Sequence, residues 1–494
     1  MELVLSVNQC PFPKQWVQWV GCFCWLAFNA YSQSLPLAWG HNSAGTLGNA
    51  SFQTFAAPMP VVTNGYLAGH RVVALAGGWA HSAAVTDDGR AFFWGQSIVG
   101  TTSDGTFLDY LSPTPVEDSG ILTNRALVAL SAGIDFTMAL DSTGHVFGWG
   151  VNASGQLGSG NQNPARDPIA VDVSGVLAGK SVMALASGAY HSLAITSDGL
   201  LVGWGEDSIS QIGDGGQFVQ RVSPVAVSTN SAIAGLRFRS VAAGEYHSLA
   251  LSTSGRVYSW GLNLHGQLGT GDVLDQKLPV SVSTSGVLSN KTVVAIAAGL
   301  SFSLALADTG ELFAWGDNEY GQLGDGTTSE RHSPVLVGQT GALAGKRVAA
   351  MTTGAAHALA VTSDGILVAW GLNEAGRLGD GTGQSRSAPV PVYTNGWLGG
   401  RFPLVLASGS TANHSMILAI SGPPQLSVAL AGQLPTLSLR GLSNTLYRID
   451  GSSTVGTHAS WSGITNALTD THGAFALSNP ASPARLFWRA SALP

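Results

Sequence analysis

Short runs of alternating apolar and polar residues recur along most of the chain, separated by Gly, Asp and Ser. One stretch holds four of them, at residues 223–228, 238–244, 246–252 and 256–261. A period of two indicates strands with one buried face, and Ser254-Gly255 fits the turn of a hairpin. Four strands joined by turns predict one small antiparallel sheet. Because such a sheet cannot bury both faces alone, neighbouring sheets must cover it.

This sheet-forming unit recurs in seven copies, each marked by a Trp-Gly dipeptide. The Trp residues are separated by steps of 55, 55, 55, 56, 55 and 55 positions. A second marker, Gly-x-x-His-Ser or a variant with Phe136 or Phe302, keeps the same phase. Self-similarity at a fixed period indicates a repeat architecture. We therefore predict an all-β fold, a seven-bladed β-propeller.

The residues that mark the repeat are expected to be structural. The Trp side chains supply area for packing between blades. Symmetry places the histidines on different blades, so we expect no metal site, and we expect buried rings whose nitrogens bond neighbouring backbone. The structural set is Trp39, Trp94, Trp149, Trp204, Trp260, Trp315, Trp370, His81, His191, His247, His357 and His414.

The two ends of the repeat region predict how the ring closes. The first Trp-Gly strand, at Trp39, has no Gly-x-x-His strand before it. The last Gly-x-x-His strand, from His414 to Ile420, has no Trp-Gly strand after it. Each end lacks what the other holds, so the N-terminal strand should complete the last blade. The propeller is therefore expected to span 35–421.

Three motifs resemble the regulator of chromosome condensation repeat. They are Trp-Gly-x-Asn-x-x-Gly-Gln-Leu-Gly, seen at 315–324, a Pro-x-x-Val strand, and Ala-Gly-x-x-His-Ser-Leu-Ala-Leu, at 243–251. The resemblance implies a seven-bladed propeller with mainly structural repeats. The family includes a nuclear exchange factor for a small GTPase and the secreted beta-lactamase inhibitor protein II, so it implies no single function.

Both ends of the chain differ from the repeats. Residues 1–32 combine Lys14, an apolar stretch at 16–28 and the small-x-small exit Ala30-Tyr31-Ser32, which predicts a signal peptide cleaved after Ser32. All three cysteines fall inside it, so the mature chain has no thiol for a disulfide or metal. Residues 425–494 hold further strand-like runs and predict a small β-sandwich-like C-terminal domain. Its last residues resemble C-terminal β modules of secreted bacterial repeat proteins.

Composition narrows the function. The net charge is −7 and no run of Lys or Arg is present, which argues against nucleic acid as a partner. The Asp-Gly pairs fit hairpin turns, and none has the ligand spacing of a calcium loop. No nucleophile elbow, zinc-protease motif or phosphate loop occurs. We therefore expect no cofactor, no metal and no catalytic residue, and we interpret the protein as a binding protein and not an enzyme.

Candidate binding residues lie where the scaffold leaves the sequence free. The two positions between Gly and His vary from repeat to repeat, and equivalent turns should share one rim of the propeller. Aromatic and acidic side chains on a rigid rim are typical of a protein-binding face, and the alternative is that these positions vary because nothing constrains them. The candidates are Trp79, Asp135, Tyr190, Glu245 and Tyr246.

We therefore expect a secreted or cell-surface monomer, without an integral membrane segment in the mature chain, that binds an unidentified extracellular or envelope protein through this rim. Two alternatives stay open. One is a regulator of a small GTPase resembling a guanine-nucleotide exchange factor, which rests on family analogy alone. The other is a structural surface protein that uses the propeller as a spacer.

Overall fold

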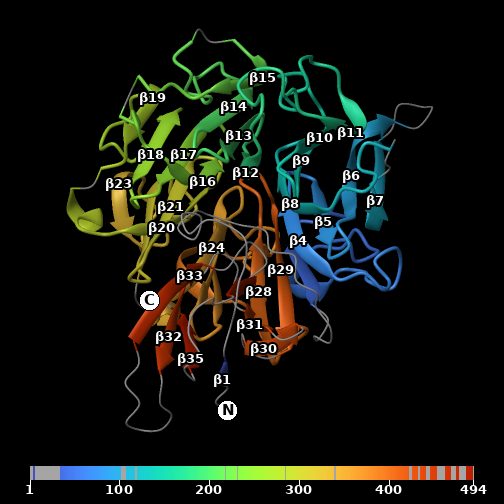
Figure 1. The fold of residues 1–494 in the computed structure, drawn as a ribbon, viewed down its shortest axis with the longest axis vertical. Helices are drawn as coiled ribbons and strands as arrows, with labels where there is room; N and C mark the ends of the chain where they lie inside the picture. The colour runs from blue at the N-terminus through green and yellow to red at the C-terminus, as the bar shows by residue number, and fades with distance from the viewer. Residues whose placement is uncertain are drawn as a thin grey trace.

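Seven four-stranded antiparallel sheets stand around a common centre in the computed structural model (Figure 1). This arrangement confirms the predicted all-β, seven-bladed propeller. The structure describes residues 4–5, 34–101, 107–116, 120–216, 219–230, 232–283, 285–338, 341–421 and, between 425 and 492, six strand segments.

The blades are numbered 1 to 7 along the chain, and blade 1 begins with β4. Within each blade, the strands are called first to fourth from the propeller axis outward. The innermost strands are β4 (Val72–Gly77), β8 (Leu127–Ala132), β12 (Val182–Ser187), β16 (Phe238–Ala243), β20 (Val293–Ala298), β24 (Val348–Thr353) and β28 (Arg401–Ala407). The second strands are β5 (His81–Thr86), β9 (Phe136–Asp141), β13 (His191–Thr196), β17 (His247–Ser252), β21 (Phe302–Ala307), β25 (His357–Thr362) and β29 (His414–Ser421).

The third strands carry the Trp-Gly dipeptides, and the fourth strands form the outer edges. The third strands are β6 (Ala91–Thr101), β10 (Val146–Gly150), β14 (Leu201–Gly205), β18 (Val257–Gly261), β22 (Leu312–Gly316), β26 (Leu367–Gly371) and β2 (Leu35–Gly40). The fourth strands are β7 (Phe107–Pro115), β11 (Ala165–Ala170), β15 (Arg221–Ala226), β19 (Gln276–Ser281), β23 (Arg331–Leu336), β27 (Arg386–Pro391) and β3 (Phe55–Pro60). Two short 3₁₀ turns, η2 (Gly286–Leu288) and η3 (Gly341–Leu343), lead into blades 5 and 6.

The grouping of strands into blades corrects one expectation. The run 223–228 was expected to share a sheet with the three runs that follow it. In the structure β15 pairs with β14, so it is the outer strand of the preceding blade. The order of the strands in the sequence does not show where one blade ends and the next begins. The run 223–228 can be grouped with the strands before it or after it, and either grouping gives four consecutive antiparallel strands.

The ring closes non-covalently in blade 7. Its sheet has the order β28-β29-β2-β3, and Trp39 lies opposite Ser415 in the register between β2 and β29. The N-terminal strand therefore completes the last blade, as predicted, and it brings β3 with it as the outer strand. Innermost strands of successive blades contact one another around the whole circle, including β28 with β4. Closure leaves no blade without a neighbour on either face.

The hydrophobic core lies between the blades. The second strands are buried along their whole length in blades 1 to 6, as in β17. Each cluster of buried residues joins two sheets, for example Leu304 in blade 5 with Trp370 in blade 6. Burial on both faces explains why these strands are apolar and small at nearly every position.

The last 70 residues and the N-terminal end contribute few described elements. The strands β30 (Gln425–Ala431), β31 (Leu434–Arg440) and β34 (Ala474–Leu477) form one sheet. A second sheet has the order β1-β35-β32-β33, with β1 (Val4–Leu5), β32 (Leu446–Ser452), β33 (Ser462–Leu468) and β35 (Leu486–Ala492). The sandwich-like domain stays a prediction. The rest of the proposed signal peptide, 1–3 and 6–32, lies outside the described residues.

Deleting Leu35–Gly40 should destabilise the whole propeller. The deletion removes buried Trp39 and the strand that joins β3 to β29. Loss of a buried Trp alone costs about 3–5 kcal/mol, and the deletion should exceed this because blade 7 also loses its outer strand. Thermal unfolding of the deletion variant beside Trp39→Ala measures both effects. A deletion that melts within a degree or two of full length would mean that the ring closes elsewhere.

Candidate functional site

A buried Asn organises the loop after most Trp-Gly dipeptides. In blade 5, Asn318 Oδ1 accepts the N–H of Leu323 at 3.0 Å, and its Nδ2 donates to the carbonyls of Thr327 and Ser329 at 3.2 and 2.9 Å. The amide thus joins both halves of the loop. This explains the motif spacing, because the acceptor and donor sides of one side chain fix the residues five, nine and eleven positions later. Equivalent buried residues are Asn42, Asn152, Asn263 and Asn373.

Each such loop is also bonded to the next blade through one backbone carbonyl. The carbonyl of Gln267 in blade 4 accepts hydrogen bonds from Trp315 Nε1 and from Ser303 Oγ in blade 5, both at 2.9 Å. His247 Nε2 of blade 4 lies 3.0 Å from the same Ser303 hydroxyl. Because that hydroxyl donates to the carbonyl, the ring nitrogen donates to the hydroxyl. Trp39, Trp94, Trp204, Trp260 and Trp370 make the equivalent indole bond.

The in-phase histidines have a side-chain partner that the sequence did not predict. Their Nε2 atoms lie 2.7 to 3.0 Å from a Ser or Thr hydroxyl of the next blade. Burial lowers the pKa of His81 and of His247, and a backbone hydrogen bond, with Ile134 and Leu300 respectively, opposes this shift. The pKa of His247 falls to about 3, so the ring is neutral.

The preceding Gly is required because a Cβ at Gly244 would lie 2.1 Å from His247 Cε1. The His247 ring therefore packs against the backbone of its own turn. Phe136 and Phe302 pack in the same way against Gly133 and Gly299, so Phe can replace His there.

The turns between the first and second strands meet around the propeller axis, on what we call the first rim. Backbone bonds join successive turns: the N–H of Ala189 donates to Gly244, that of Glu245 to Leu300, and that of Leu300 to Ala355. The predicted sharing of one rim by these turns is therefore present. The longest turn, 409–413, reaches across to blade 3, where Ser410 Oγ donates to the carbonyl of Ser187 at 3.3 Å.

Four of the five candidate binding residues lie together on this rim. The rings of Tyr190 and Tyr246 are tilted against each other with centroids 6.2 Å apart. Burial raises the pKa of Tyr190, and the charges of Asp135 and Glu245, which lie on the two adjoining turns bonded to its own, raise it further. Trp79 lies on the next turn, in blade 1, with 44% of its surface exposed. Within the described ranges, no contact joins the Trp79 ring to the other four.

Among the described residues, the two carboxylates of the cluster have no cationic partner. Burial raises the pKa of Asp135 and of Glu245, and no ion pair or side-chain hydrogen bond to either carboxylate is found among the described residues. Nearby Glu206, on the loop after Trp204, accepts a hydrogen bond from Ser154 Oγ at 2.8 Å. Half-buried, unpaired acids beside tyrosine rings make an acidic, aromatic surface suited to a cationic group.

The loop of blade 3 departs from the repeat beside this cluster. Asp207 replaces the buried Asn, with only 1% of its surface exposed, and accepts the N–H of Ile212 at 2.9 Å. Ser210 has φ +61° where the other loops use Gly. Burial raises the pKa of Asp207 to about 7, and Asp214 and Glu206 add to the shift, while the Ile212 bond and Arg221 oppose it.

Sequence reasoning missed a second group of exposed aromatic side chains. Tyr66, Tyr393 and Trp397 are 65%, 44% and 52% exposed, on the two loops that flank blade 7 at the opposite, second rim. The replacement of Ala, Val or Ile by Tyr66 and Trp397 at equivalent loop positions is a sequence signal that could have identified them. Exposed aromatic residues alone therefore do not identify the first rim as the binding surface.

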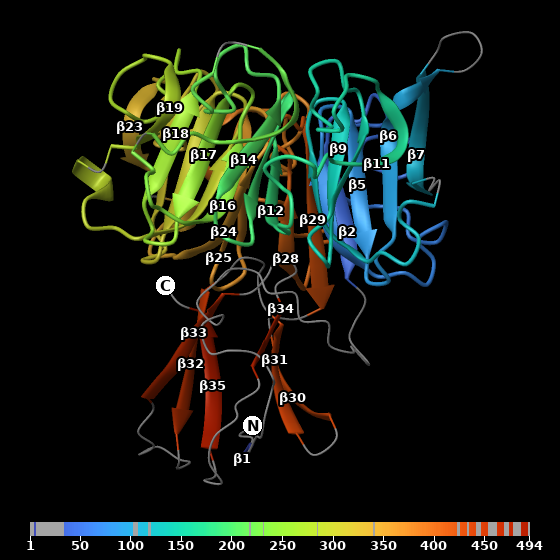
Figure 2. The same ribbon diagram turned by 45° about the horizontal axis from the view of Figure 1, so that its top comes forward.

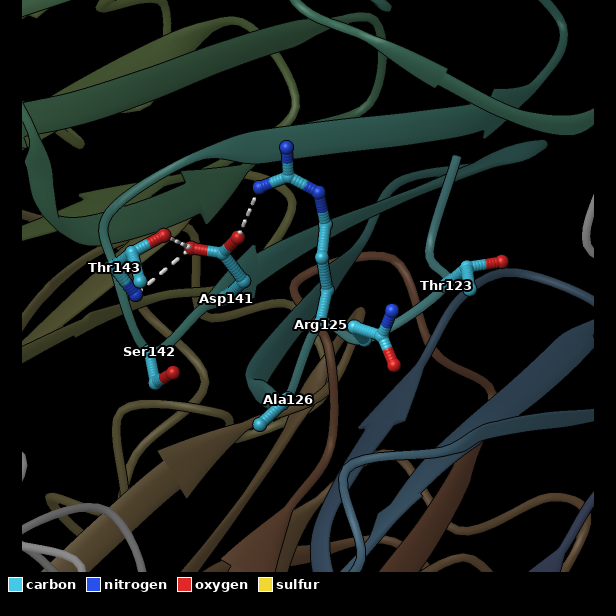
Figure 3. Close-up of a pocket in the computed structure, with 7 residues that line it drawn as sticks. Thr123, Arg125, Ala126, Asp141, Ser142 and Thr143 are labelled. Atoms are coloured by element: carbon cyan, nitrogen blue, oxygen red, sulfur yellow. Dashed lines mark hydrogen bonds and ion pairs between the residues drawn. The ribbon is translucent and has the colours of Figure 1, made fainter. Parts of the chain in front are cut away.

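A pocket on the second rim belongs to the scaffold. Figure 3 shows Arg125 pointing to Asp141 across it, with Nη1 2.7 Å from Oδ2, and the cavity measures about 240 Å³. Equivalent pairs, such as Lys180 with Asp198 at 3.1 Å, hold the same loop in other blades. The pocket therefore recurs with the repeat, and Asp141 already neutralises the charge of Arg125.

The irregular segment after Trp94 forms a hairpin. The strands β6 and β7 continue past the usual loop, pairing Gln96 with Asp109 and Thr101 with Phe107, so they are longer than the corresponding strands of the other blades (Figure 2). Its tip, 102–106, lies outside the described residues. In the part of the chain that the structure describes, no three His, Cys, Asp or Glu side chains are grouped to hold a metal ion. No described helix has the length and apolar character to cross a bilayer.

These features define a closed propeller of Trp-Gly repeats whose loops are bonded from blade to blade. The family model of the RCC1-like domain matches residues 29–417, so the chain belongs to that family. Human E3 ubiquitin-protein ligase HERC2 is 32% identical over 399 residues, which are 80% of this chain but only 8% of HERC2. Ultraviolet-B receptor UVR8 of Arabidopsis thaliana is 30% identical, over 72% of this chain and 77% of UVR8.

Other relatives confirm the family and the fold. A Bos taurus protein named secretion-regulating guanine nucleotide exchange factor is 32% identical, with 77% of this chain and 82% of that protein covered. The solved structure of Prp20p from Saccharomyces cerevisiae, described with its binding to Gsp1p and histones, has a TM-score of 0.67 at 21% identity, covering 80% and 95%. At that identity the likeness shows the fold alone.

Asp207→Asn should stabilise the protein above neutral pH and remove a pH dependence. The raised pKa means that the folded chain keeps the Asp207 proton up to about pH 7, while the unfolded chain loses it near pH 4. Stability from this group is thus complete below about pH 4 and is lost as the pH rises to about 7. At pH 8 the free energy of unfolding of Asp207→Asn should exceed that of the parent chain by roughly 1–3 kcal/mol. The Asn amide stays neutral and can donate hydrogen bonds inside the loop, as Asn318 does.

Chemical denaturation of both proteins from pH 5 to 8 measures this difference, with Ser210→Gly as the control. That variant relieves the positive φ and should stabilise by the same amount at every pH. Parallel pH curves for the parent chain and Asp207→Asn would show that Asp207 is ionised throughout and the explanation is wrong.

Proposed function

We propose that this chain is an exported protein-binding platform that holds its partner at the first rim, over blades 1 to 4. The observation that carries the proposal is the cluster of Asp135, Tyr190, Glu245 and Tyr246, in which two unpaired carboxylates lie beside two tyrosine rings. The complementary partner surface carries Lys or Arg side chains. Export rests on the signal-like residues 1–32.

The rigid scaffold supports this function. The turns that carry the four residues are bonded to one another through backbone, so their side chains are held with little conformational freedom to lose on binding. The repeat needs none of these side chains, since the corresponding positions in blade 6 are Ala355 and Ala356. Unpaired acids at these sites weaken the folded state slightly, a cost that binding would offset.

A second candidate is regulation of a small GTPase by nucleotide exchange. The similarity to the relative named as a guanine nucleotide exchange factor favours it, because most of both chains is covered. The two candidate functions differ in the expected location of the protein and in its expected activity. Recovery of the protein inside cells with residues 1–32 retained, and accelerated nucleotide release from a GTPase, would favour exchange.

Tyr246→Ala and Trp79→Ala should weaken partner binding strongly. Interface energy concentrates in a few aromatic anchors, at about 2 kcal/mol or more each, so each variant should bind roughly 30-fold more weakly. The partner is first captured from the native extracellular fraction with the purified chain, and its dissociation constant is then measured by titration calorimetry. Glu245→Gln tests the charge at the same site.

Trp397→Ala is the matched control, since it removes a comparably exposed Trp from the second rim. It should bind normally. If Trp397→Ala loses binding while both first-rim variants keep it, the partner lies on the second rim and the proposal fails. Unfolding of the first-rim variants, checked by their melting temperatures, would instead make these residues part of the scaffold.

A further inference from the structure

Arg377 departs from the repeat in a way that the scaffold does not require. The loops of blades 2 to 5 have Gln at this position, and its Oε1 accepts the N–H of the residue two positions earlier, as Gln322 does from Tyr320 at 2.9 Å. Arg has no acceptor atom, so Arg377 gives up this bond. Its backbone carbonyl keeps the structural role and accepts from Trp39 Nε1 and Ser415 Oγ. Only the side chain is new.

The Arg377 side chain is buried with most of its donors unused. Only 6% of the residue is exposed. A guanidinium has five N–H donors, and among the described residues only Asn413 Oδ1 accepts from this one, at 3.0 Å, while Nε has no partner. No ion pair joins Arg377 to any described carboxylate, in contrast to Arg386 of the same loop, whose Nη2 lies 3.0 Å from Asp380. Burying an unpaired charge is costly, which points to a missing counter-charge.

The surroundings of Arg377 add donors and one acid that forms no ion pair with it: burial lowers the pKa of Arg377, and the charge of exposed Glu374 on the same loop raises it. The charge of Arg377, after burial, lowers the pKa of half-buried His41, which places the imidazole near the guanidinium. Thr411, two residues from Asn413, is buried and its hydroxyl has no partner in the described part of the chain. These residues lie on blades 6 and 7, away from the acidic cluster of blades 2 to 4. The first rim thus carries a buried cation, Arg377, as well as the acidic cluster.

We propose that Arg377 is an anion-recognition residue that binds an oxyanion, of the carboxylate or phosphate class, at the first rim between blades 6 and 7. The planar guanidinium offers its free N–H groups to two oxygens at once, the geometry that Arg uses for carboxylates and phosphates. Asn413, on the longest turn, is already bonded to the same guanidinium. The inference goes beyond the proposed function and needs no protein partner.

The test compares the parent chain with Arg377→Gln, which restores the repeat residue and should therefore fold. Melting temperatures are measured against inorganic phosphate and, separately, sodium acetate, with chloride holding the ionic strength constant. Phosphate stabilises most proteins through general exclusion from their surface, so the readout is the difference between variants. A bound anion adds stability in proportion to the logarithm of its concentration above its dissociation constant. Arg386→Gln, whose guanidinium is already paired, controls for the loss of one positive charge.

The parent chain and Arg386→Gln should show an increment of melting temperature with one or both anions that Arg377→Gln lacks. Without added anion, Arg377→Gln should melt at the same temperature or higher, because the buried charge is gone. An acetate response identifies the carboxylate class, as found on acidic side chains, and a phosphate response alone identifies free or esterified phosphate. Equal responses in all three proteins, or a lower melting temperature of Arg377→Gln without anion, would overturn the proposal.

Discussion

At six of the described junctions between blades, one backbone carbonyl in a loop accepts the Trp indole of the following blade. At four of them the carbonyl also accepts a Ser hydroxyl to which the preceding His donates, as at Gln267, Trp315 and Ser303. All of these groups are buried, so each unmade bond would cost far more than a bond at the surface. The repeat motif is the set of residues that this junction requires, and blade closure depends on it.

This junction explains what the sequence could predict. The alternation of apolar and polar residues, the period of the Trp-Gly pairs and the missing half-units at the two ends are sequence patterns, and they predicted the strands, seven blades and the closing strand. The hydrogen-bond partner of His247 could not be predicted, because it lies 56 residues away on another blade. The phase of the outer strand was equally undetermined, since β15 lies between two sheets in the sequence and pairs with only one.

The first rim shows where the scaffold stops constraining the chain. Variation between Gly and His predicted the candidate residues, but only the structure joins Asp135, Tyr190, Glu245 and Tyr246 and leaves Trp79 apart. The segment after Trp204 departs visibly from the repeat motif, but its sequence does not show what Asp207 does there, and Arg377 is one substitution within a long motif. Both stand out once the buried partners of Asn318 and Gln322 are known. Departures from a repeat become informative when the physical task of the repeat residue is known.

The seven blades form one closed unit, which an equivalent indole–carbonyl bond holds at six of the described junctions. Hydrogen exchange of the Trp indole N–H groups tests it most directly, because Trp39, Trp94, Trp204, Trp260, Trp315 and Trp370 each donate to the carbonyl of a neighbouring blade. The account predicts that Trp39, in the blade closed by the two chain ends, exchanges as slowly as the others, through unfolding of the whole ring. Much faster exchange of Trp39 than of Trp260 would contradict it, because blade 7 would then open independently.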